Sequence, residues 1–365
     1  MLPIIFFFLS FALSVAATVL VRKIALRFGI LDWPKPLGRK IHKIPTPLMG
    51  GLAVFFAFTF TLFVCLKLGL WPEGNICLKH LIGVVVSGGI LMFGGFLDDY
   101  FHLKPLQQIV WPMLASLVII ISGIGIEYIN NPFGSGYIYF DQIKIELFRL
   151  KGIPYYFTPF ADIFTFVWLM TLAYATKLLD GLDGLVSGIG AIGSFIIAGV
   201  CFLTEFFQPD VGMLAVIFAG ALLGFLVFNF HPAKIFLGEG GSLLVGFYLG
   251  VLSIISGGKI ATSFLVLGLA IIDIGWVIWR RMFKIHKSPF LGDREHLHFR
   301  MLKAGFSHRG AVFFLWAIAA FWGGLALLFR TRGKLILIAL LFCFIFFLNF
   351  VIEHCKRNKI KQSNL

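Results

Sequence analysis

Apolar segments of membrane-spanning length recur along almost the whole chain. A transmembrane helix needs about 17 to 25 mainly apolar residues. Segments near that length lie at 3–21, 48–66, 81–97, 109–126, 161–176, 185–203, 211–228, 241–256, 260–279, 311–329 and 335–352. Only helices and closed barrels satisfy every backbone polar group inside a bilayer. The pattern therefore predicts an all-α polytopic membrane protein with about 10–11 transmembrane helices, of which 161–176 is the weakest candidate.

The overall composition excludes an ordinary soluble protein. The 365 residues are 59% hydrophobic and only 13% charged, with a mean hydropathy of +0.95, whereas soluble domains carry about a quarter charged residues. The net charge is +14, and the basic residues lie in loops between apolar segments. Anionic lipid headgroups and anionic substrates are the expected partners. Nucleic acid is not expected, because no nucleic-acid-binding motif accompanies the charge.

The distribution of basic residues predicts the orientation in the membrane. If the N-terminus lies outside, most of the 31 Lys and Arg residues fall on the inner side, as expected from the positive-inside rule. The C-terminus is then cytoplasmic. We expect residues 1–355 to form a single integral membrane domain and residues 356–365 to form a basic cytoplasmic tail.

The longest expected outside stretch is 127–160. Tyr137-Ile-Tyr-Phe140 and Ile143-Lys-Ile-Glu146 alternate apolar and polar residues around Asp141-Gln142. This alternation is typical of strands and predicts a small β-hairpin outside the membrane.

Two acidic pairs lie at the ends of apolar segments, where carboxylates are costly unless they have a function. In Asp98-Asp99, helical neighbours point about 100° apart, so one carboxylate can face a cation while the other orients a base or water. Asp180 and Asp183 of the sequence Asp-Gly-Leu-Asp share one helical face if this segment is helical, and then need a cation or hydrogen-bond donors between them. The simpler alternatives are a solvated helix end and a solvated turn.

The segment from Asn229 to Ser242 ends in a glycine-rich turn at the start of an expected helix. Free backbone N–H groups at such a terminus bind phosphate, and the helix dipole favours an anion there. Glu239 can ligate a hard cation such as Mg²⁺. Phe236 can stack on a base, or can simply pack at the membrane interface.

Two further segments combine basic and imidazole side chains. Residues 288–299 hold Asp293, Arg294, His296 and His298. These residues lack a third soft ligand for zinc, so contacts with phosphate or sugar are expected instead; a solvated amphipathic loop is the alternative. Residues 38–51 add Arg39 and His42 beside the second apolar segment, either as a basic approach to the site or as positive-inside anchoring.

In this order, the five segments resemble the polyprenyl-phosphate N-acetylhexosamine-1-phosphate transferases of glycosyltransferase family 4. The strongest matches are Asp180-Gly-Leu-Asp-Gly-Leu185 and Arg294-Glu-His-Leu-His298 beside Asp98-Asp99. The entry from Arg39 to Gly51 is more similar to the undecaprenyl-phosphate GlcNAc-1-phosphate branch than to the related phospho-N-acetylmuramoyl-pentapeptide transferases.

The resemblance implies a reaction, a place and a set of site residues. A sugar 1-phosphate, GlcNAc-1-phosphate in this branch, passes from a UDP-N-acetylhexosamine to polyprenyl (undecaprenyl) phosphate, and UMP is released. This is the first membrane step of cell-envelope glycan synthesis, on the cytoplasmic face of the plasma (inner) membrane, by an enzyme that depends on Mg²⁺ (Mn²⁺ is an alternative ion) and can pair as a homodimer. The catalytic residues are Asp98, Asp99, Asp180 and Asp183. The metal ligands are Glu239, Asp98 and Asp99. The substrate-binding residues are Lys177, Asn229, Phe236, Asp293, Arg294, His296, His298, Arg39 and His42.

The reaction route stays open at this point. The lipid phosphate can attack the sugar-bearing phosphorus directly, with Asp98 or Asp99 deprotonating or orienting it. A covalent aspartyl intermediate is the other route, and the residues favour neither.

The chain departs from the family pattern at five positions. Lys177 and Tyr174 stand where the family usually has asparagines. Glu239 replaces Asp, Gln108 replaces a common Lys, and Phe299 replaces the last His of the histidine motif. We hypothesise that the changes at Lys177 and Glu239 are coupled, with a new cation facing a longer carboxylate across the site.

Two other classes of function remain as alternatives. An ion-coupled transporter can use the same carboxylates, although transporter sites lie near the bilayer midplane, whereas these acids gather at one membrane face. A catalytically inactive scaffold of a glycan-assembly complex is the other alternative, suggested by the departures from the family pattern.

Overall fold

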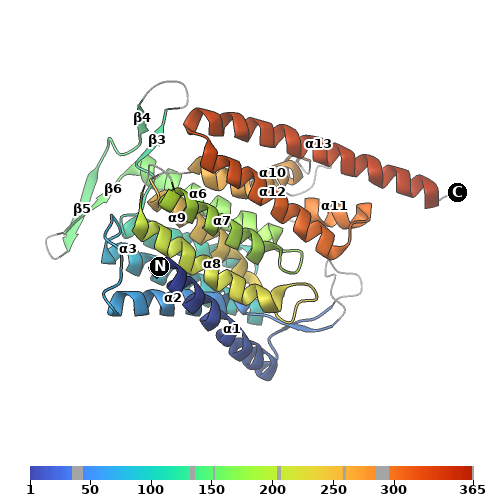
Figure 1. Cartoon of the computed structure of the whole chain (residues 1–365), viewed down its shortest axis with the longest axis horizontal. Helices are drawn as coiled ribbons and strands as arrows, with labels where there is room; N and C mark the ends of the chain where they lie inside the picture. Colours follow the sequence, from blue (N-terminus) through green and yellow to red (C-terminus); the bar gives the residue numbers. More distant parts are fainter. Residues whose placement is uncertain are drawn as a thin grey trace.

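The computed structural model describes residues 1–34, 44–131, 136–150, 153–203, 207–257, 260–280, 282–283 and 296–363. Within these residues, ten helices are long and apolar enough to cross a membrane. They are α1 (Leu2–Phe28), α2 (Gly50–Lys67), α3 (Leu78–Phe101), α6 (Pro159–Leu179), α7 (Leu185–Leu203), α8 (Pro209–Asn229), α9 (Gly238–Ile255), α10 (Ile260–Arg280), α12 (His308–Leu328) and α13 (Thr331–Ser363). They lie side by side in one bundle (Figure 1). The chain is therefore an all-α polytopic membrane protein, as predicted.

One predicted span is formed by a helix that is too short by itself. After α4 (Pro105–Gln108), α5 (Val110–Ile121) has 12 residues, or about 18 Å of helix. A Cβ on Gly94 near the end of α3 would meet Trp111 at the start of α5, and a Cβ on Gly83 near the start of α3 would meet Ser122. Helix α5 therefore runs antiparallel to α3, between the same two ends of the bundle.

The prediction misjudged which span would be weak. Segment 161–176 forms the 21-residue helix α6, whereas the helix in 109–126 ends at Ile121, just before Gly123 takes a left-handed φ of 87°. Hydropathy does not detect this ending, because the residues after Gly123 are apolar as well.

The strands lie mainly at the end of the bundle where α3 and α6 begin, which we call the strand face (Figure 1). Strands β3 (Tyr128–Asn130) and β4 (Tyr137–Tyr139) form one antiparallel pair, and β5 (Ile145–Leu150) and β6 (Ile153–Phe157) form another. Extended structure is confirmed here, but the single hairpin around Asp141-Gln142 is wrong. Alternation of side chains predicts a strand but not the strand with which it pairs. Strand β4 pairs with the preceding strand β3, not with the following strand β5.

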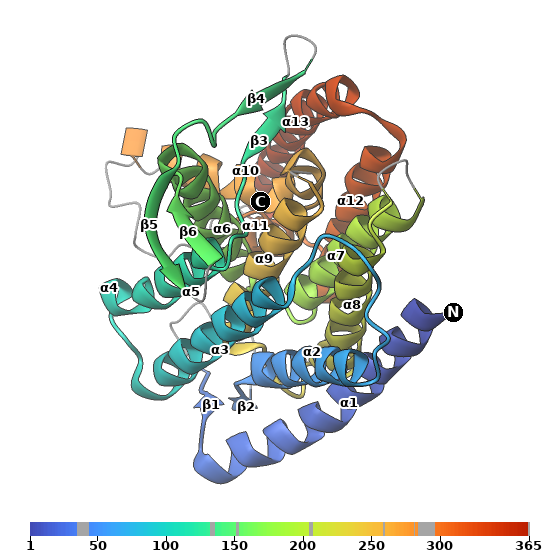
Figure 2. The ribbon, with the colours of Figure 1, turned by 90° about the vertical axis from the view of Figure 1, so that its left-hand side faces the viewer.

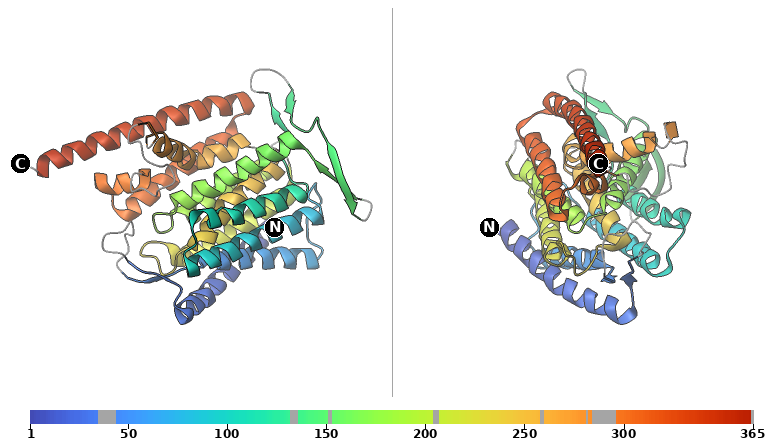
Figure 3. Two further views of the ribbon diagram at one scale, coloured as in Figure 1. Left: turned by 180° about the vertical axis from the view of Figure 1, so that it is seen from behind. Right: turned by 90° about the vertical axis from the view of Figure 1, so that its right-hand side faces the viewer.

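The opposite end, where α3 and α6 end and α9 begins, is called the site face. A small pair, β1 (Leu31–Asp32) with β2 (Thr46–Pro47), links α1 to α2 there. The N-terminus lies at the strand face, and α13 continues through residue 363 beyond the site face (Figure 3). The opposite positions of the two termini agree with the predicted topology.

Helix α9 is the centre of the bundle, with 83% of its apolar window buried, compared with 28% for α1 and for α13. Figure 2 shows it enclosed by the other helices. Glycines allow this close packing, because backbones approach most closely where side chains are small. A Cβ on Gly241 would lie 2.7 Å from the Gly51 Cα, and a Cβ on Gly240 would lie 3.0 Å from the Gly95 Cα. Glu239, at the start of α9, is thereby held beside α2 and α3.

Candidate functional site

The end of α3 brings the first predicted carboxylates against the start of α9. Asp99 Oδ1 accepts a hydrogen bond of 3.1 Å from the Glu239 backbone N–H. Asp98 Oδ1 accepts from the backbone N–H of Leu103 at 2.9 Å and from Gln108 Nε2 at 3.1 Å. Asp98 is 6% exposed and Asp99 8%. Both carboxylates are thus fixed by hydrogen bonds, but with lone pairs left for other partners, since an ionised carboxylate can accept about four.

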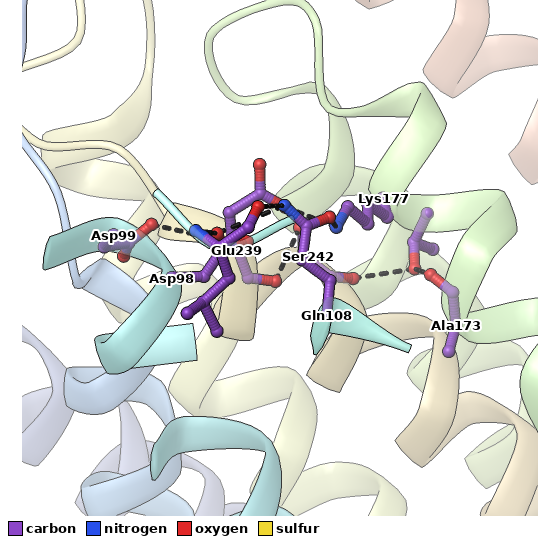
Figure 4. A network of polar contacts seen from close by, with 9 residues as sticks. Asp98, Asp99, Gln108, Ala173, Lys177, Glu239 and Ser242 are labelled. Atoms are coloured by element: carbon purple, nitrogen blue, oxygen red, sulfur yellow. Dashed lines mark hydrogen bonds and ion pairs between the residues drawn. The ribbon is translucent and has the colours of Figure 1, made fainter. Parts of the chain in front are cut away.

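Lys177, near the end of α6, forms a second connection between Glu239 and Asp98. Its Nζ lies 2.8 Å from Glu239 Oε2 and donates to Gln108 Oε1 at 2.9 Å. A chain of contacts therefore runs from Glu239 through Lys177 and Gln108 to Asp98, and Figure 4 shows these groups in one network. The expectation that Lys177 and Glu239 face each other is confirmed. Gln108, noted in the sequence only as a departure, proves to be the link between them and α3.

The segment from Asp180 to Gly184 is a turn, so the helical face proposed for its two carboxylates does not exist. Helix α6 ends at Leu179, Asp180 has φ −74° and ψ 63°, and Gly184 has a left-handed φ of 79°. The two side chains therefore do not share a helical face. Asp183 turns to His231, with 2.7 Å between its Oδ2 and Nδ1, and accepts the Ala233 backbone N–H at 3.1 Å.

Asp180 lies close enough to the network of Asp98, Asp99, Lys177 and Glu239 to interact with the charge of Glu239. The surrounding protein atoms, then the charges of Glu239 and Asp183, raise the pKa of its carboxyl group to about 8. The residue is nevertheless exposed to water, and solvent screens part of this effect. Asp180 therefore keeps contact with water at the end of α6.

Two histidines that the sequence analysis did not single out complete the surroundings of Asp183. The rings of His231 and His308 stack with their centroids 4.0 Å apart, and His308 Nε2 accepts the Asp183 backbone N–H at 2.9 Å. One ligand atom from each of the three residues lies within 4.8 Å of the others. The sequence held a signal for His231, which lies two residues after Asn229, but none for His308.

The histidine motif lies under the turn. His296 Nδ1 is 2.8 Å from Asp273 Oδ2, and Asp273 also accepts the Leu297 backbone N–H at 3.0 Å. His298, on α11 (Leu297–Ala304), is fully buried against Gly181. Burial, then His296 and His308, lower the pKa of His298 to about 3, so this imidazole is neutral at physiological pH. Neutral His298 offers no positive charge to a phosphate, and neither of its ring nitrogens has a hydrogen-bond partner among the described residues.

Asp273, like His231 and His308, was not predicted from the sequence. It is 3% exposed within the apolar helix α10. A carboxylate inside a membrane-length apolar segment is itself a signal, and here it identifies the partner that holds the histidine motif.

Asn229 and the glycine turn have mainly internal contacts. Asn229 Oδ1 accepts from the Gly184 backbone N–H at 3.1 Å and from Ser187 Oγ at 2.9 Å, and its Nδ2 donates to the Ile235 carbonyl at 3.0 Å. Asp99 accepts the Glu239 N–H, so this one N–H group at the start of α9 is already engaged within the protein. Phe236 is half-buried beside the start of α2, where its carbonyl accepts the Gly50 N–H.

Four predicted substrate-binding residues, Arg39, His42, Asp293 and Arg294, lie outside the described residues. The other predicted residues lie at the site face, in the carboxylate network, around the turn or on the histidine motif. Glu239 interacts electrostatically with Asp98, Asp99 and Asp180. Carboxylate oxygens are the ligands that a hard divalent cation of the Mg²⁺ type prefers. Within the described residues, the group whose ligand atoms already lie within 4.8 Å of one another is Asp183, His231 and His308.

Comparisons with known proteins show the family to which the chain belongs. The model of glycosyl transferase family 4 matches residues 81–257. A decaprenyl-phosphate N-acetylglucosaminephosphotransferase of Mycolicibacterium smegmatis is 31% identical over 346 residues, 87% of this chain and 80% of the relative. An undecaprenyl-phosphate alpha-N-acetylglucosaminyl 1-phosphate transferase of Salmonella typhi is 28% identical over 84% of this chain and 78% of its own length. With a relative so similar over most of both chains, and with the acidic motifs gathered at one end of the bundle, the protein is a member of glycosyl transferase family 4.

Proposed function

We propose that the protein transfers N-acetylglucosamine 1-phosphate from a UDP-sugar to polyprenyl phosphate and releases UMP. The observation that carries the proposal is the network of Asp98, Asp99, Lys177 and Glu239 at the end of a membrane bundle. A water-soluble donor and a lipid acceptor can both reach such a place. The activities for which the relatives are named supply the sugar and the lipid class.

The reaction forms one phosphorus–oxygen bond and breaks another. An oxygen of the lipid phosphate attacks the sugar-bearing phosphorus of the donor, and the bond from that phosphorus to the UMP oxygen breaks. Asp98 or Asp99, held rigidly by hydrogen bonds, orients the incoming lipid phosphate, and the Lys177 ammonium faces the donor phosphates. The route without a covalent aspartyl intermediate needs no further residue.

A cofactor is part of the proposal, because a cluster of carboxylates repels two phosphorylated substrates. We infer that Mg²⁺, or Mn²⁺ in its place, is held by Glu239 with Asp98 and Asp99. When bound, this ion supplies positive charge that offsets the charge on the departing UMP. Asp180 stands beside these ligands as a further carboxylate.

The proposed location is the cytoplasmic side of the plasma membrane. The basic residues favour the site face as the inner side, and a UDP-N-acetylhexosamine is a charged substrate that does not cross lipid unaided. Because the donor reacts on this face, the lipid-linked sugar is formed on the same face.

The test is UMP release by the purified protein in detergent with UDP-GlcNAc, a polyprenyl phosphate and Mg²⁺. We expect release that requires the lipid and stops when a chelator is added. Donor binding without UMP release, for any common UDP-N-acetylhexosamine, would reject the proposed activity and favour the scaffold. Uptake of solute into proteoliposomes without a covalent product would instead favour a transporter.

A further inference from the structure

Lys177 places an ammonium in the last turn of the apolar helix α6, among carboxylates. Its side chain is 14% exposed, and its partner Glu239 is 42% exposed. The 2.8 Å contact occupies Oε2 of the very carboxylate that is proposed to hold the metal. We propose that Lys177 is a built-in counter-cation that competes with the divalent ion for Glu239 until the donor binds. This inference rests on the proposed function.

The competition follows from distance and charge. A Mg²⁺ ligand oxygen lies about 2.0–2.1 Å from the ion, so an ion at Glu239 Oε2 would stand close to the Lys177 Nζ now 2.8 Å from the same oxygen. Two cations that close repel strongly in a partly dehydrated site. Either the ammonium or the metal ion can bind that oxygen. The ammonium is part of the chain, so it is always present to compete.

Gln108 keeps the ammonium in place from the other side. It accepts from Lys177 with Oε1 and donates to Asp98 with Nε2. The hydrogen bond to Gln108 uses one N–H group of the ammonium, so the ammonium can still donate to a further acceptor. A diphosphate is such an acceptor, and its oxygens also ligate the metal ion.

Donor and metal should therefore favour each other. When a diphosphate gives Lys177 a new anionic partner, the Glu239 carboxylate becomes available to the metal. Coupling of this kind is reciprocal, so each ligand must raise the affinity for the other by the same factor. The site would then fill with metal mainly when the donor is present.

The experiment measures Mn²⁺ binding, by electron paramagnetic resonance, to the whole protein in detergent without lipid acceptor. Lys177→Met is compared with Lys104→Met, which removes an equal charge from an exposed lysine near the same end of the bundle. Without nucleotide, we expect Lys177→Met to bind Mn²⁺ about tenfold more tightly than the unaltered protein, and Lys104→Met to stay within about twofold. UDP should then tighten Mn²⁺ binding by the unaltered protein by a larger factor than in Lys177→Met.

The outcomes separate this inference from the proposed activity. If folded Lys177→Met binds Mn²⁺ no more tightly than Lys104→Met, the competition is overturned even when the unaltered enzyme releases UMP. If the tightening is seen but no UMP is released, the competition stands and the proposed activity fails. Should Lys177→Met not fold, Lys177→Asn replaces it. A failure of UDP to tighten Mn²⁺ binding by the unaltered protein overturns the inference by itself.

Discussion

Asp99 on α3 accepts the backbone N–H of Glu239 on α9 at 3.1 Å, across 140 positions of the sequence. The contact joins two acidic segments that the sequence presents as separate motifs. It also fixes the start of α9, because Gly238 before it has a left-handed φ of 76° and packs on the same carboxylate. The position of Glu239 thus depends on Asp99 as well as on its own helix.

Asp98→Asn should reduce turnover by about a hundredfold or more. The amide oxygen can still accept from Leu103 and Gln108, so the fold should persist while the charge is lost, and charge stabilisation in such sites is worth several kcal/mol. The rate of UMP release measures the effect. Asp162→Asn, which alters a carboxylate bound to Thr158 at the strand face, should leave turnover within about twofold. A fully active Asp98→Asn protein would remove Asp98 from the catalytic residues.

Asp183 and His231 should act as one unit. Their 2.7 Å contact implies a coupling energy of about 0.5–3 kcal/mol. We therefore expect Asp183→Asn and His231→Ala each to lower kcat/KM, and the double variant to be little worse than the more damaged single one. The test is to measure kcat/KM for the unaltered protein, the two single variants and the double variant. Asp162→Asn combined with His231→Ala should instead show additive losses, and additivity in the Asp183 cycle would contradict the pairing.

Asp180 should make the protein less stable as pH rises. Because its folded pKa is raised to about 8, the folded state holds this proton over a range in which the unfolded chain has released it. Stability from this group is present at acidic pH and is lost from about pH 4 up to about pH 8, above which it is constant. Asp180→Asn should remove that slope. The midpoint of thermal unfolding, measured in detergent with a chelator, should rise relative to the unaltered protein between pH 5 and pH 8. Parallel pH profiles would refute the assignment.

Gly241→Ala should separate α9 from α2 and misplace Glu239. The added Cβ would lie 2.7 Å from the Gly51 Cα, and overpacking of this kind costs about 1–3 kcal/mol. Both the unfolding midpoint and the rate of UMP release should fall. Gly324→Ala on α12 is the matched control, because nothing lies within 4 Å of its added Cβ. Equal behaviour of the two variants would show that close packing at Gly241 does not position the site.

Much of the site was predictable because carboxylates are costly beside lipid. Asp98, Asp99, Asp180 and Glu239 stand out in an apolar chain, and they do interact at one face. Asp273 could have been found by the same reasoning, since it interrupts an apolar segment. His308 could not, because nothing near it in the sequence indicates that it will stack on His231.

The sequence by itself determined the class of the fold, the approximate number of spans and the opposite positions of the two termini. Hydropathy and basic charge act locally, residue by residue, and they can be read along the chain. Only the tertiary structure decided that β4 pairs with β3, that Asp183 on its turn contacts His231, and that Lys177 reaches Glu239 with Gln108 beside it. These contacts join residues far apart in the chain. Their geometry is set by how closely glycines let the helices approach, which no local pattern records.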